Sequence, residues 1–179
     1  MVYKKIIHGN SVDLRPVEKC DAAYIIDLRN SQLARYLHPV GSSIEAQEQW
    51  IEKQRSREGD YYFMMLDKEG ERIGTVGLSS IIGECGETSR FISTGTPLQN
   101  TETNLLITDF AFSEAGLTRI EGYVSTDNIS VISLQKRFGY VFEDEVKEKD
   151  GIPVRYARLL KEDYLKKRPR IVSLIERLQ

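Results

Sequence analysis

The stretch LTRIEGYVSTDNISVISLQKRFGY, residues 117–140, decides how this chain folds. Its first nine residues predict a strand. Asp127 or Asn128, both favourable N-cap residues, then begins a helix that runs to Arg137. Gly139 follows at the position where a glycine commonly ends a helix. The stretch therefore predicts a strand followed directly by a helix.

The segment after this stretch predicts a hairpin and a helical tail. Residues 140–148 are one strand candidate, Asp150-Gly151 is a strong hairpin signal, and residues 154–160 return as the last strand. The tail from Glu162 carries apolar residues at helical spacing, so we expect a terminal helix there. These apolar residues are Ile171, Leu174, Ile175 and Leu178.

The segment before this stretch contains three further strand candidates. They cover residues 61–66, 72–82 and 87–94, and the turns between them contain glycine. The polar residues 95–103 come next and lead into a helix that we expect from about residue 101 to residue 114. Three successive strands joined by short turns indicate an antiparallel sheet.

The N-terminal part predicts a short strand, residues 11–17, and two helices. Asp21 can cap the first helix, and Ser42 or Ser43 can cap the second. Antiparallel strands followed by strand–helix–strand connections make an α+β domain with a mixed sheet.

Length and composition fit one compact globular domain. The chain has 179 residues, of which 29% are charged and 40% hydrophobic. It shows no repeats and no linker-like tract, so we read residues 1–179 as a single domain in which 162–179 form the helical tail. The formal net charge of −2 argues against a general nucleic-acid binder, which needs a basic surface.

Apolar runs and cysteines indicate the compartment. The longest apolar runs, residues 105–107 and 171–175, are too short to span a bilayer, and residues 1–10 lack the apolar core of a signal peptide. Without a secretion signal, Cys20 and Cys85 are expected to be reduced thiols. The sequence thus predicts a cytoplasmic protein with no membrane partner and no metal site.

The helix expected near Thr101 offers a first candidate binding site. The N-terminus of a helix presents unpaired N–H groups and a partial positive charge, which favour a phosphate. Asn100, Thr101, Thr103 and Asn104 would add side-chain donors there. A capped helix start that binds nothing is the alternative.

Residues 117–140 contain two motifs that occur in a fixed order and spacing. One is LTRIE at 117–121 with Val124 and Asn128, and the other is SLQKRFGY at 133–140. Their order and spacing resemble the GNAT superfamily, in the branch of the ribosomal-protein N-acetyltransferases and spermidine acetyltransferase. The resemblance covers about residues 12–164 and includes Asp13-Leu14-Arg15-Pro16, Asp150-Gly151 and Arg158-Leu159-Leu160-Lys161-Glu162.

The resemblance implies a fold and an activity. The fold is the GNAT fold, in which helices flank a central mixed, mostly antiparallel sheet that splays. The activity is N-acetyl transfer from acetyl-CoA, used as a co-substrate, to a primary amine of a small molecule. Members of the superfamily often pair through sheet edges, which makes a homodimer one option.

The resemblance also places the cofactor. The last of the three consecutive strands would splay from its neighbour, pair with the pantetheine arm and bring strand N–H groups near the thioester carbonyl, where they stabilise an oxyanion. Asn128 and Ser133 would touch the pantetheine. Lys136 or Arg137 could meet a CoA phosphate, or form only a solvated helix face. The strand residues are Phe91, Ile92, Ser93 and Thr94, and the pyrophosphate residues are Gln99, Asn100, Thr101, Glu102, Thr103 and Asn104.

Two departures from the family pattern stand out. Residues 96–102 contain no glycine where the family has a glycine-rich pyrophosphate loop, and Glu102 adds a like charge. This shorter loop resembles that of nucleotide-amino-sugar acetyltransferases, as do Arg29-Asn30 and Tyr61-Tyr62-Phe63. Gln135 stands where many members carry a tyrosine that protonates the leaving thiolate, and glutamine cannot act as an acid at pH 7.

Three residues are candidates for the base that takes a proton from the acceptor amine: Glu87, Tyr123 and His38. Each has a plainer interpretation. Glu87 can be a solvated strand residue, Tyr123 a core aromatic residue, and His38 a loop histidine.

The acceptor is expected between the loop that joins the two N-terminal helices and the last hairpin. Arg29, Asn30, Tyr36 and His38 are the polar candidates there. Arg29 could clamp a phosphate or carboxylate bidentately, or form a salt bridge within its own helix.

The sequence leaves the acceptor open. A nucleotide-linked amino sugar is slightly favoured over a protein N-terminus or a polyamine. A polyamine would want an acidic face, for which Glu143-Asp144-Glu145 is the candidate. A degenerate GNAT domain that binds or regulates without catalysis is the alternative from another class.

Overall fold

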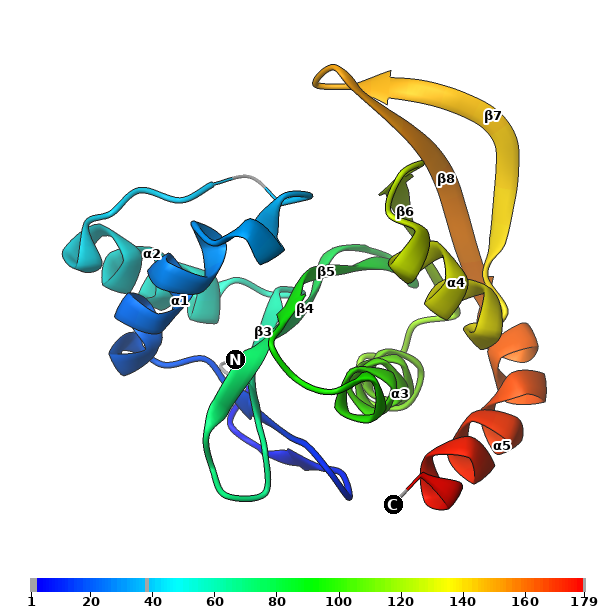
Figure 1. The fold of residues 1–179 in the computed structure, drawn as a ribbon, viewed down its shortest axis with the longest axis horizontal. Helices are drawn as coiled ribbons and strands as arrows, with labels where there is room; N and C mark the ends of the chain where they lie inside the picture. The colour runs from blue at the N-terminus through cyan, green and yellow to red at the C-terminus, as the bar shows by residue number, and fades with distance from the viewer. Residues whose placement is uncertain (1–2, 38, 179) are drawn as a thin grey trace.

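The computed structural model describes residues 3–37 and 39–178. Within them eight strands form one sheet in the order β1-β2-β3-β4-β5-β6-β8-β7, and helices flank it (Figure 1). Among the strands that the structure describes, only β5 and β6 pair in parallel, so the predicted α+β fold with a mixed, mostly antiparallel sheet is confirmed. The strands are β1 (Ile7–His8), β2 (Asp13–Pro16), β3 (Tyr61–Leu66), β4 (Arg72–Ile82), β5 (Cys85–Ser93), β6 (Arg119–Ser125), β7 (Val141–Lys149) and β8 (Ile152–Leu160).

Five α-helices cover this sheet (Figure 1). Two of them lie beside its first half and two beside its second half, and the long third helix crosses the middle. They are α1 (Ala22–Arg29), α2 (Ile44–Ser56), α3 (Pro97–Ser113), α4 (Ile129–Phe138) and α5 (Lys161–Arg177), and the short 3-10 helices are η1 (Lys19–Asp21) and η2 (Gln32–Ala34). No helix among the described residues is long and apolar enough to cross a membrane.

Strand β3 shows why the sheet is buried on both faces. Side chains alternate along a strand, so Phe63 and Met65 pack with α3 and α5, while Tyr62 and Met64 pack with α1 and α2. Fully burying a side chain such as Phe or Met contributes about 1.5–3 kcal/mol. The continuous apolar run of β3 therefore fixes helices on both sides of the sheet.

Strands β5 and β6 diverge after a short contact. They pair only at Cys85 with Arg119 and at Gly86 with Ile120, although β5 continues to Ser93. Beyond Gly86, no described strand pairs with β5 on the side that faces β6. The splay expected near residues 91–94 is confirmed, and it begins earlier, at residue 87.

The start of α3 differs from the sequence prediction. We expected a loop to about Thr101, but the helix begins at Pro97. Thr96 is the N-cap and forms a capping box with Gln99, and Pro97 occupies the first helical position, where its missing N–H costs nothing. The prediction of a polar loop over 95–103, with a helix only from about residue 101, was therefore wrong for residues 97–100.

Other local predictions are confirmed. Ser43 caps α2 through the N–H of Ala46, and Asn128 is the N-cap of α4. Asp150 and Gly151 both have positive φ, 52° and 76°, as a two-residue hairpin turn with φ > 0 at both positions requires.

The C-terminal tail is a helix that is tied to α3. Its buried Tyr164 donates a hydrogen bond to Asp109 Oδ1 at 2.7 Å, and Arg168 binds both oxygens of the same carboxylate at 2.7 and 2.8 Å. This network explains why the predicted terminal helix packs on the domain.

Candidate active site

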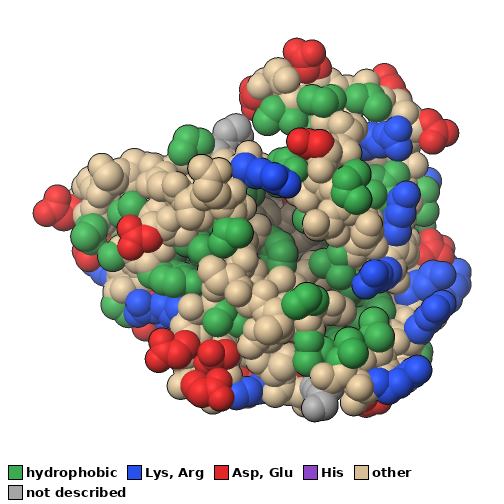
Figure 2. Space-filling model, in the orientation of Figure 1, with side chains coloured by type: hydrophobic (Ala, Val, Ile, Leu, Met, Phe, Trp, Pro, Cys, Tyr) green, Lys and Arg blue, Asp and Glu red, His purple; other side chains and the backbone are tan. Residues whose placement is uncertain are grey.

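A cavity of about 530 Å³ lies between helices α1 and α2 and strand β5. Figure 2 shows the surface hollowed between the half that carries α1 and α2 and the half that carries β6, β7 and β8. Aromatic, aliphatic and basic side chains line the cavity, and none of its described lining residues is acidic. They are Ile25, Arg29, Tyr36, Leu37, Val40, Gly41, Ser43, Ala46, Gln47, Trp50, Tyr62, Ser89 and Arg90.

Arg90 forms the floor of this cavity at a bulge in β5. The strand register shifts there, and Arg90 has a φ of 55°, which is uncommon for a residue with a side chain. Its guanidinium binds both oxygens of Asp60 at 2.6 and 3.2 Å and lies over the rings of Trp50 and Tyr62, 5.3 and 5.1 Å from their centroids. These contacts hold the arginine in one position.

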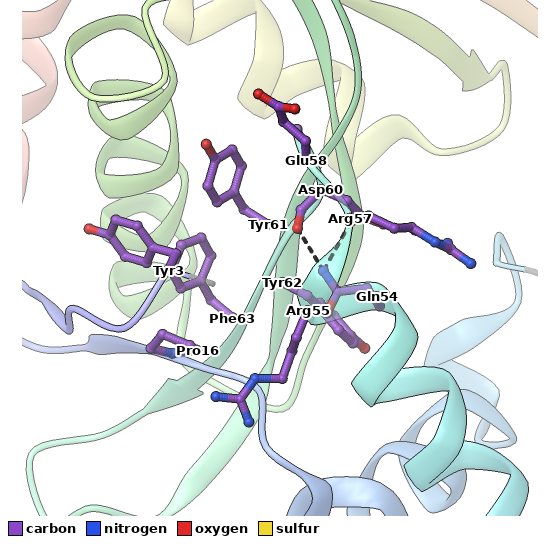
Figure 3. Close-up of a pocket in the computed structure, with 11 residues that line it drawn as sticks. Tyr3, Pro16, Gln54, Arg55, Arg57, Glu58, Asp60, Tyr61, Tyr62 and Phe63 are labelled. Carbon is purple, nitrogen blue, oxygen red and sulfur yellow. Dashed lines mark hydrogen bonds and ion pairs between the residues drawn. The ribbon is translucent and has the colours of Figure 1, made fainter. Parts of the chain in front are cut away.

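A second, smaller cavity of about 200 Å³ lies at the end of α2 and the start of β3 (Figure 3). Gln54 and Asp60 both line it, and Gln54 Nε2 donates to the backbone oxygen of Asp60 at 2.8 Å. Gln54 Nε2 also donates to Asp60 Oδ1 at 3.2 Å, so a buried glutamine fixes the carboxylate that holds Arg90. This small cavity is lined by the residues that support Arg90, and Tyr62 lines both cavities.

The acceptor candidates divide between the cavity and other places. Arg29 and Tyr36 line the cavity. The Tyr36 hydroxyl also donates to the backbone oxygen of Asp127 at 3.1 Å, which joins the loop after α1 to the start of α4 across the splay. Asn30 is exposed at the end of α1 and does not line the cavity. His38 lies outside the described residues.

The two cavity arginines influence each other. Burial lowers the pKa of Arg29, and the nearby positive charge of Arg90 lowers it further. Because both arginines line the same cavity, their positive charges would attract an anion there.

Glu87 lies at the closed end of the splay. A Cβ atom at Gly122 on β6 would come within 2.8 Å of Glu87 Oε1, so the glycine makes room for this carboxylate. Burial raises the pKa of Glu87, and the positive charges of Lys149 and Arg90 partly oppose the shift. Glu87 and the cavity residue Ser89 are two positions apart on the same face of β5, roughly 7 Å.

Tyr123 lies on the other side of the splay, on β6. Its ring packs edge-on against Tyr156, with centroids 5.5 Å apart, and Lys149 Nζ lies 3.5 Å from its centroid. Lys149 thus reaches from the end of the β7–β8 hairpin to both base candidates that the structure describes.

Comparison with known proteins gives one family. Residues 11–141 match the acetyltransferase (GNAT) domain. The chain belongs to this GNAT acetyltransferase family. A comparison with curated proteins found no match.

Several solved GNAT structures share the fold. FdhC, described as a nucleotide-linked sugar GNAT, has 25% identity and a TM-score of 0.81, and the match covers 95% of this chain and 98% of FdhC. A spermidine N-acetyltransferase from Vibrio cholerae, solved with CoA and spermine, has 22% identity and a TM-score of 0.78, with 88% and 99% covered. A GCN5-related N-acetyltransferase from Brucella melitensis has 18% identity and a TM-score of 0.77, with 97% and 86% covered.

GNAT enzymes use acetyl-CoA, and the splay leaves one strand edge of this chain open. The β5 edge beyond Gly86 offers backbone groups with no strand opposite them to an extended pantetheine arm. Phe91 packs into the core beside α3, and Ile92 packs against α1, so this edge is rigidly held. Ser93 and Thr94 both donate through their hydroxyls to a backbone oxygen of β4.

On α4 the GNAT candidates are arranged as follows. Asn128 Oδ1 accepts from the N–H of Val131 at 3.4 Å, and Ser133 and Lys136 are exposed. Gln135 Oε1 is buried and has no hydrogen-bond partner among the described residues. Tyr140, directly after α4, has its pKa raised to about 12 by burial, so its phenol stays protonated at neutral pH.

Most of the predicted pyrophosphate residues use their polar side-chain atoms for hydrogen bonds within the protein. Glu102 is 3% exposed and accepts hydrogen bonds from the backbone of Asn10 and Ser11, while Thr103 is fully buried. Thr101 and Asn104 donate their side-chain hydrogens to carbonyl groups of α3 itself. We therefore leave this segment out of the proposed cofactor site.

Sequence reasoning missed Trp50, Asp60 and Arg90. Asp60 and Arg90 are 30 positions apart, and their pairing depends on β4 lying between β3 and β5. No local sequence pattern predicts a contact between residues so far apart in the chain.

Proposed function

We propose that this GNAT enzyme acetylates the amine of a small acceptor that also carries a negative charge, with a nucleotide-linked amino sugar as the acceptor class. The observation that carries the proposal is the cavity beside β5, which presents Arg29 and Arg90 and no acidic side chain among its described residues. Guanidinium groups bind phosphate well because of their planar, multidentate geometry.

The other surfaces of the cavity suit such an acceptor. Trp50, Tyr36 and Tyr62 supply aromatic surface for a planar base or the apolar face of a sugar. The similarity to FdhC, a nucleotide-linked sugar GNAT, supports the same acceptor class.

A polyamine is a poorer match. Its positive charges would be repelled by the two arginines and would need carboxylates in the cavity. The acidic run Glu143–Glu145 lies on β7, at the edge of the sheet and separated from β5 by β6 and β8. It is exposed and does not line the cavity.

We assign Glu87 the role of base. An amine must lose a proton before it can attack, and a carboxylate with a raised pKa is better matched to that task than an ordinary one. Glu87 lies where the cavity side of β5 meets the splay, so a water molecule can bridge the amine and the carboxylate. Tyr123 is the alternative base.

Bound acetyl-CoA would supply the acetyl group as a thioester. This chain would position it by the backbone of β5 between residues 88 and 93 and by the start of α4 at Asn128. Gln135 can donate or accept a hydrogen bond near the departing sulfur but cannot donate a proton. A thiolate is a reasonable leaving group near neutral pH, so turnover does not require an acid.

The test is release of free thiol from acetyl-CoA with three acceptors: a UDP-linked amino sugar, spermidine and an alanyl peptide. We expect a preference of at least about a hundredfold in kcat/KM for the anionic acceptor, since hydrogen bonds to charged groups contribute about 1.5–3 kcal/mol each. Arg29→Met should lose most of this preference, while Arg170→Met, which changes an exposed arginine on α5, should not. Equal rates with spermidine would disprove the acceptor class, and absence of CoA binding in calorimetry would indicate a domain without catalysis.

A further inference from the structure

The backbone N–H groups at the start of α3 are almost all engaged within the protein. The N–H of Thr94 donates to a β4 carbonyl at 2.8 Å, that of Gly95 to Ser93 Oγ at 2.9 Å, and that of Thr96 to Gln99 Oε1 at 2.8 Å. These three groups are therefore not available to a ligand without breaking a hydrogen bond.

The next residues complete the pattern. Pro97 has no N–H, and the N–H groups of Gln99 and Asn100 donate to the side-chain and backbone oxygens of Thr96 at 3.3 and 2.9 Å. Within the described residues, only the N–H of Leu98 remains without a partner over positions 94–100.

Three side-chain donors of this segment are turned inward as well. Asn100 Nδ2 donates to the carbonyl of Gly95 at 3.3 Å, Thr101 Oγ1 to Pro97 at 2.8 Å, and Asn104 Nδ2 back to Asn100 at 2.8 Å. A pyrophosphate carries several charged oxygens that each need a donor once they leave water. The Leu98 N–H and the exposed Thr96 hydroxyl, which only accepts a hydrogen bond among the described residues, are too few to meet that need.

We infer that this enzyme recognises its acyl donor through the pantetheine arm and the thioester, so that an acyl-pantetheine without the nucleotide end replaces acetyl-CoA with little loss. The inference rests on the proposed function, because it takes the splay between β5 and β6 as the seat of the arm. It adds a substrate class, the acyl-pantetheine thioesters.

The chemistry of transfer is the same for both donors. The acceptor nitrogen forms a bond to the acyl carbon, the carbon–sulfur bond breaks, and the sulfur leaves as a thiolate with the electron pair of that bond. The proton lost by the amine passes through Glu87 and solvent to the thiolate, so no oxidant, reductant or metal is needed. The nucleotide end takes no part in any of these steps.

The first measurement compares acetyl-CoA with S-acetylpantetheine, by kcat/KM and by calorimetric binding of CoA and pantetheine. We expect the two donors to differ by no more than about tenfold, the contribution of one charge-assisted hydrogen bond. A site with three donors that bind the pyrophosphate would make kcat/KM more than about a thousandfold higher for acetyl-CoA than for S-acetylpantetheine. Such a ratio would overturn the inference. If neither compound binds, acyl transfer itself is excluded and the inference falls with it.

A second measurement uses a variant in which one backbone N–H of this segment loses its hydrogen-bond partner. Gln99→Ala releases the N–H of Thr96 but keeps Thr96 as the helix cap, and it should raise the CoA-to-pantetheine affinity ratio severalfold. Gln49→Ala, an exposed glutamine of α2, is the matched control and should leave the ratio unchanged, and thermal melting of both variants checks folding. An unchanged ratio in folded Gln99→Ala would mean that donor engagement does not limit pyrophosphate binding, against the inference.

Discussion

The cavity at Arg90 and the start of α3 both contain hydrogen-bond donors, but the two regions use them differently. At Arg90 the guanidinium is bound by Asp60 and still lines the cavity. At the start of α3 the donors of Thr96, Gln99 and Asn100 are used by neighbouring residues. A residue with a hydrogen-bond donor therefore does not by itself indicate a ligand site, because the donor can already be bound to an acceptor within the protein.

The difference follows from the number of hydrogens that each group carries. A guanidinium has five N–H hydrogens, so a bidentate contact with Asp60 uses two and leaves others for a ligand. A backbone N–H has one, and a capping box consumes it. An arginine side chain can thus hydrogen-bond within the protein and to a ligand at the same time. A backbone N–H at a capped helix start can do only one of the two.

Among the variants on the side of the acceptor cavity, Glu87→Gln should have the largest effect on activity. We expect kcat to fall by about 10²–10⁴, the usual contribution of a positioned base. In the unmodified enzyme the rate should fall as the pH drops through the raised pKa of Glu87, and the variant should lack this limb. Glu84→Gln, an exposed glutamate in the turn before β5, is the control, and a normal rate in Glu87→Gln would reassign the base.

Glu87→Gln should increase stability at neutral pH although it lowers activity. Because the pKa of Glu87 is higher in the folded than in the unfolded state, the folded state holds its proton more tightly. Stability is therefore lost as pH rises from the unfolded value through the folded one, and at pH 7 the ionised carboxylate costs free energy. Glu87→Gln should raise Tm at pH 7 by about 1–3 °C and leave it little changed at pH 4.

Asp60→Asn should break the support of Arg90. The side chains are 11% and 17% exposed, so removing the carboxylate leaves a largely buried cation without its partner. Full burial would cost 3–5 kcal/mol, and partial exposure lowers this to about 2 kcal/mol. Urea unfolding measures the loss, with Asp27→Asn on the exposed face of α1 as control, and equal stability of the two variants would show that Asp60 does not hold Arg90.

Much of the fold could be predicted because its signals are local. Asn128 and Gly139 bound α4 as expected, Gly139 with a φ of 100°. Strand β1 was missed, since two residues, Ile7 and His8, are too few for any periodicity and form a strand only through pairing with β2. The early start of α3 was readable from Thr96 and Gln99, which have the spacing of a capping box.

The site could be predicted only in part. Arg29 and Tyr36 were expected near the acceptor, and both line the cavity. Arg90 was not expected, because its position depends on a bulge and on Asp60, which β4 separates from it. The donors of α3 were expected to face a ligand, because sequence shows that a donor exists and not which acceptor it has.

Glu102→Gln tests whether the buried carboxylate of α3 is structural. Glu102 accepts hydrogen bonds from the N–H groups of Asn10 and Ser11 at 2.6 and 2.7 Å. Replacing one oxygen by an amide leaves a buried N–H opposite another N–H, so we expect a loss of about 1–3 kcal/mol in the free energy of unfolding. CoA affinity should stay within about twofold. Glu58→Gln, an exposed glutamate, controls for the change of charge, and tighter CoA binding in Glu102→Gln alone would show that the carboxylate does repel a phosphate.

Thr101→Val should have the smallest effect, and for that reason it discriminates best between the two regions. The Thr101 hydroxyl donates to the carbonyl of Pro97, which already accepts a backbone hydrogen bond within α3, so its loss should change stability by less than about 0.5 kcal/mol. If donors at this end of α3 are turned inward, calorimetry should find CoA affinity unchanged within about twofold, as for Thr118→Val on the exposed surface before β6. A loss of tenfold or more in Thr101→Val alone would mean that the hydroxyl leaves Pro97 to bind a phosphate. The start of α3 would then resemble the Arg90 cavity, where one group serves both the fold and a ligand.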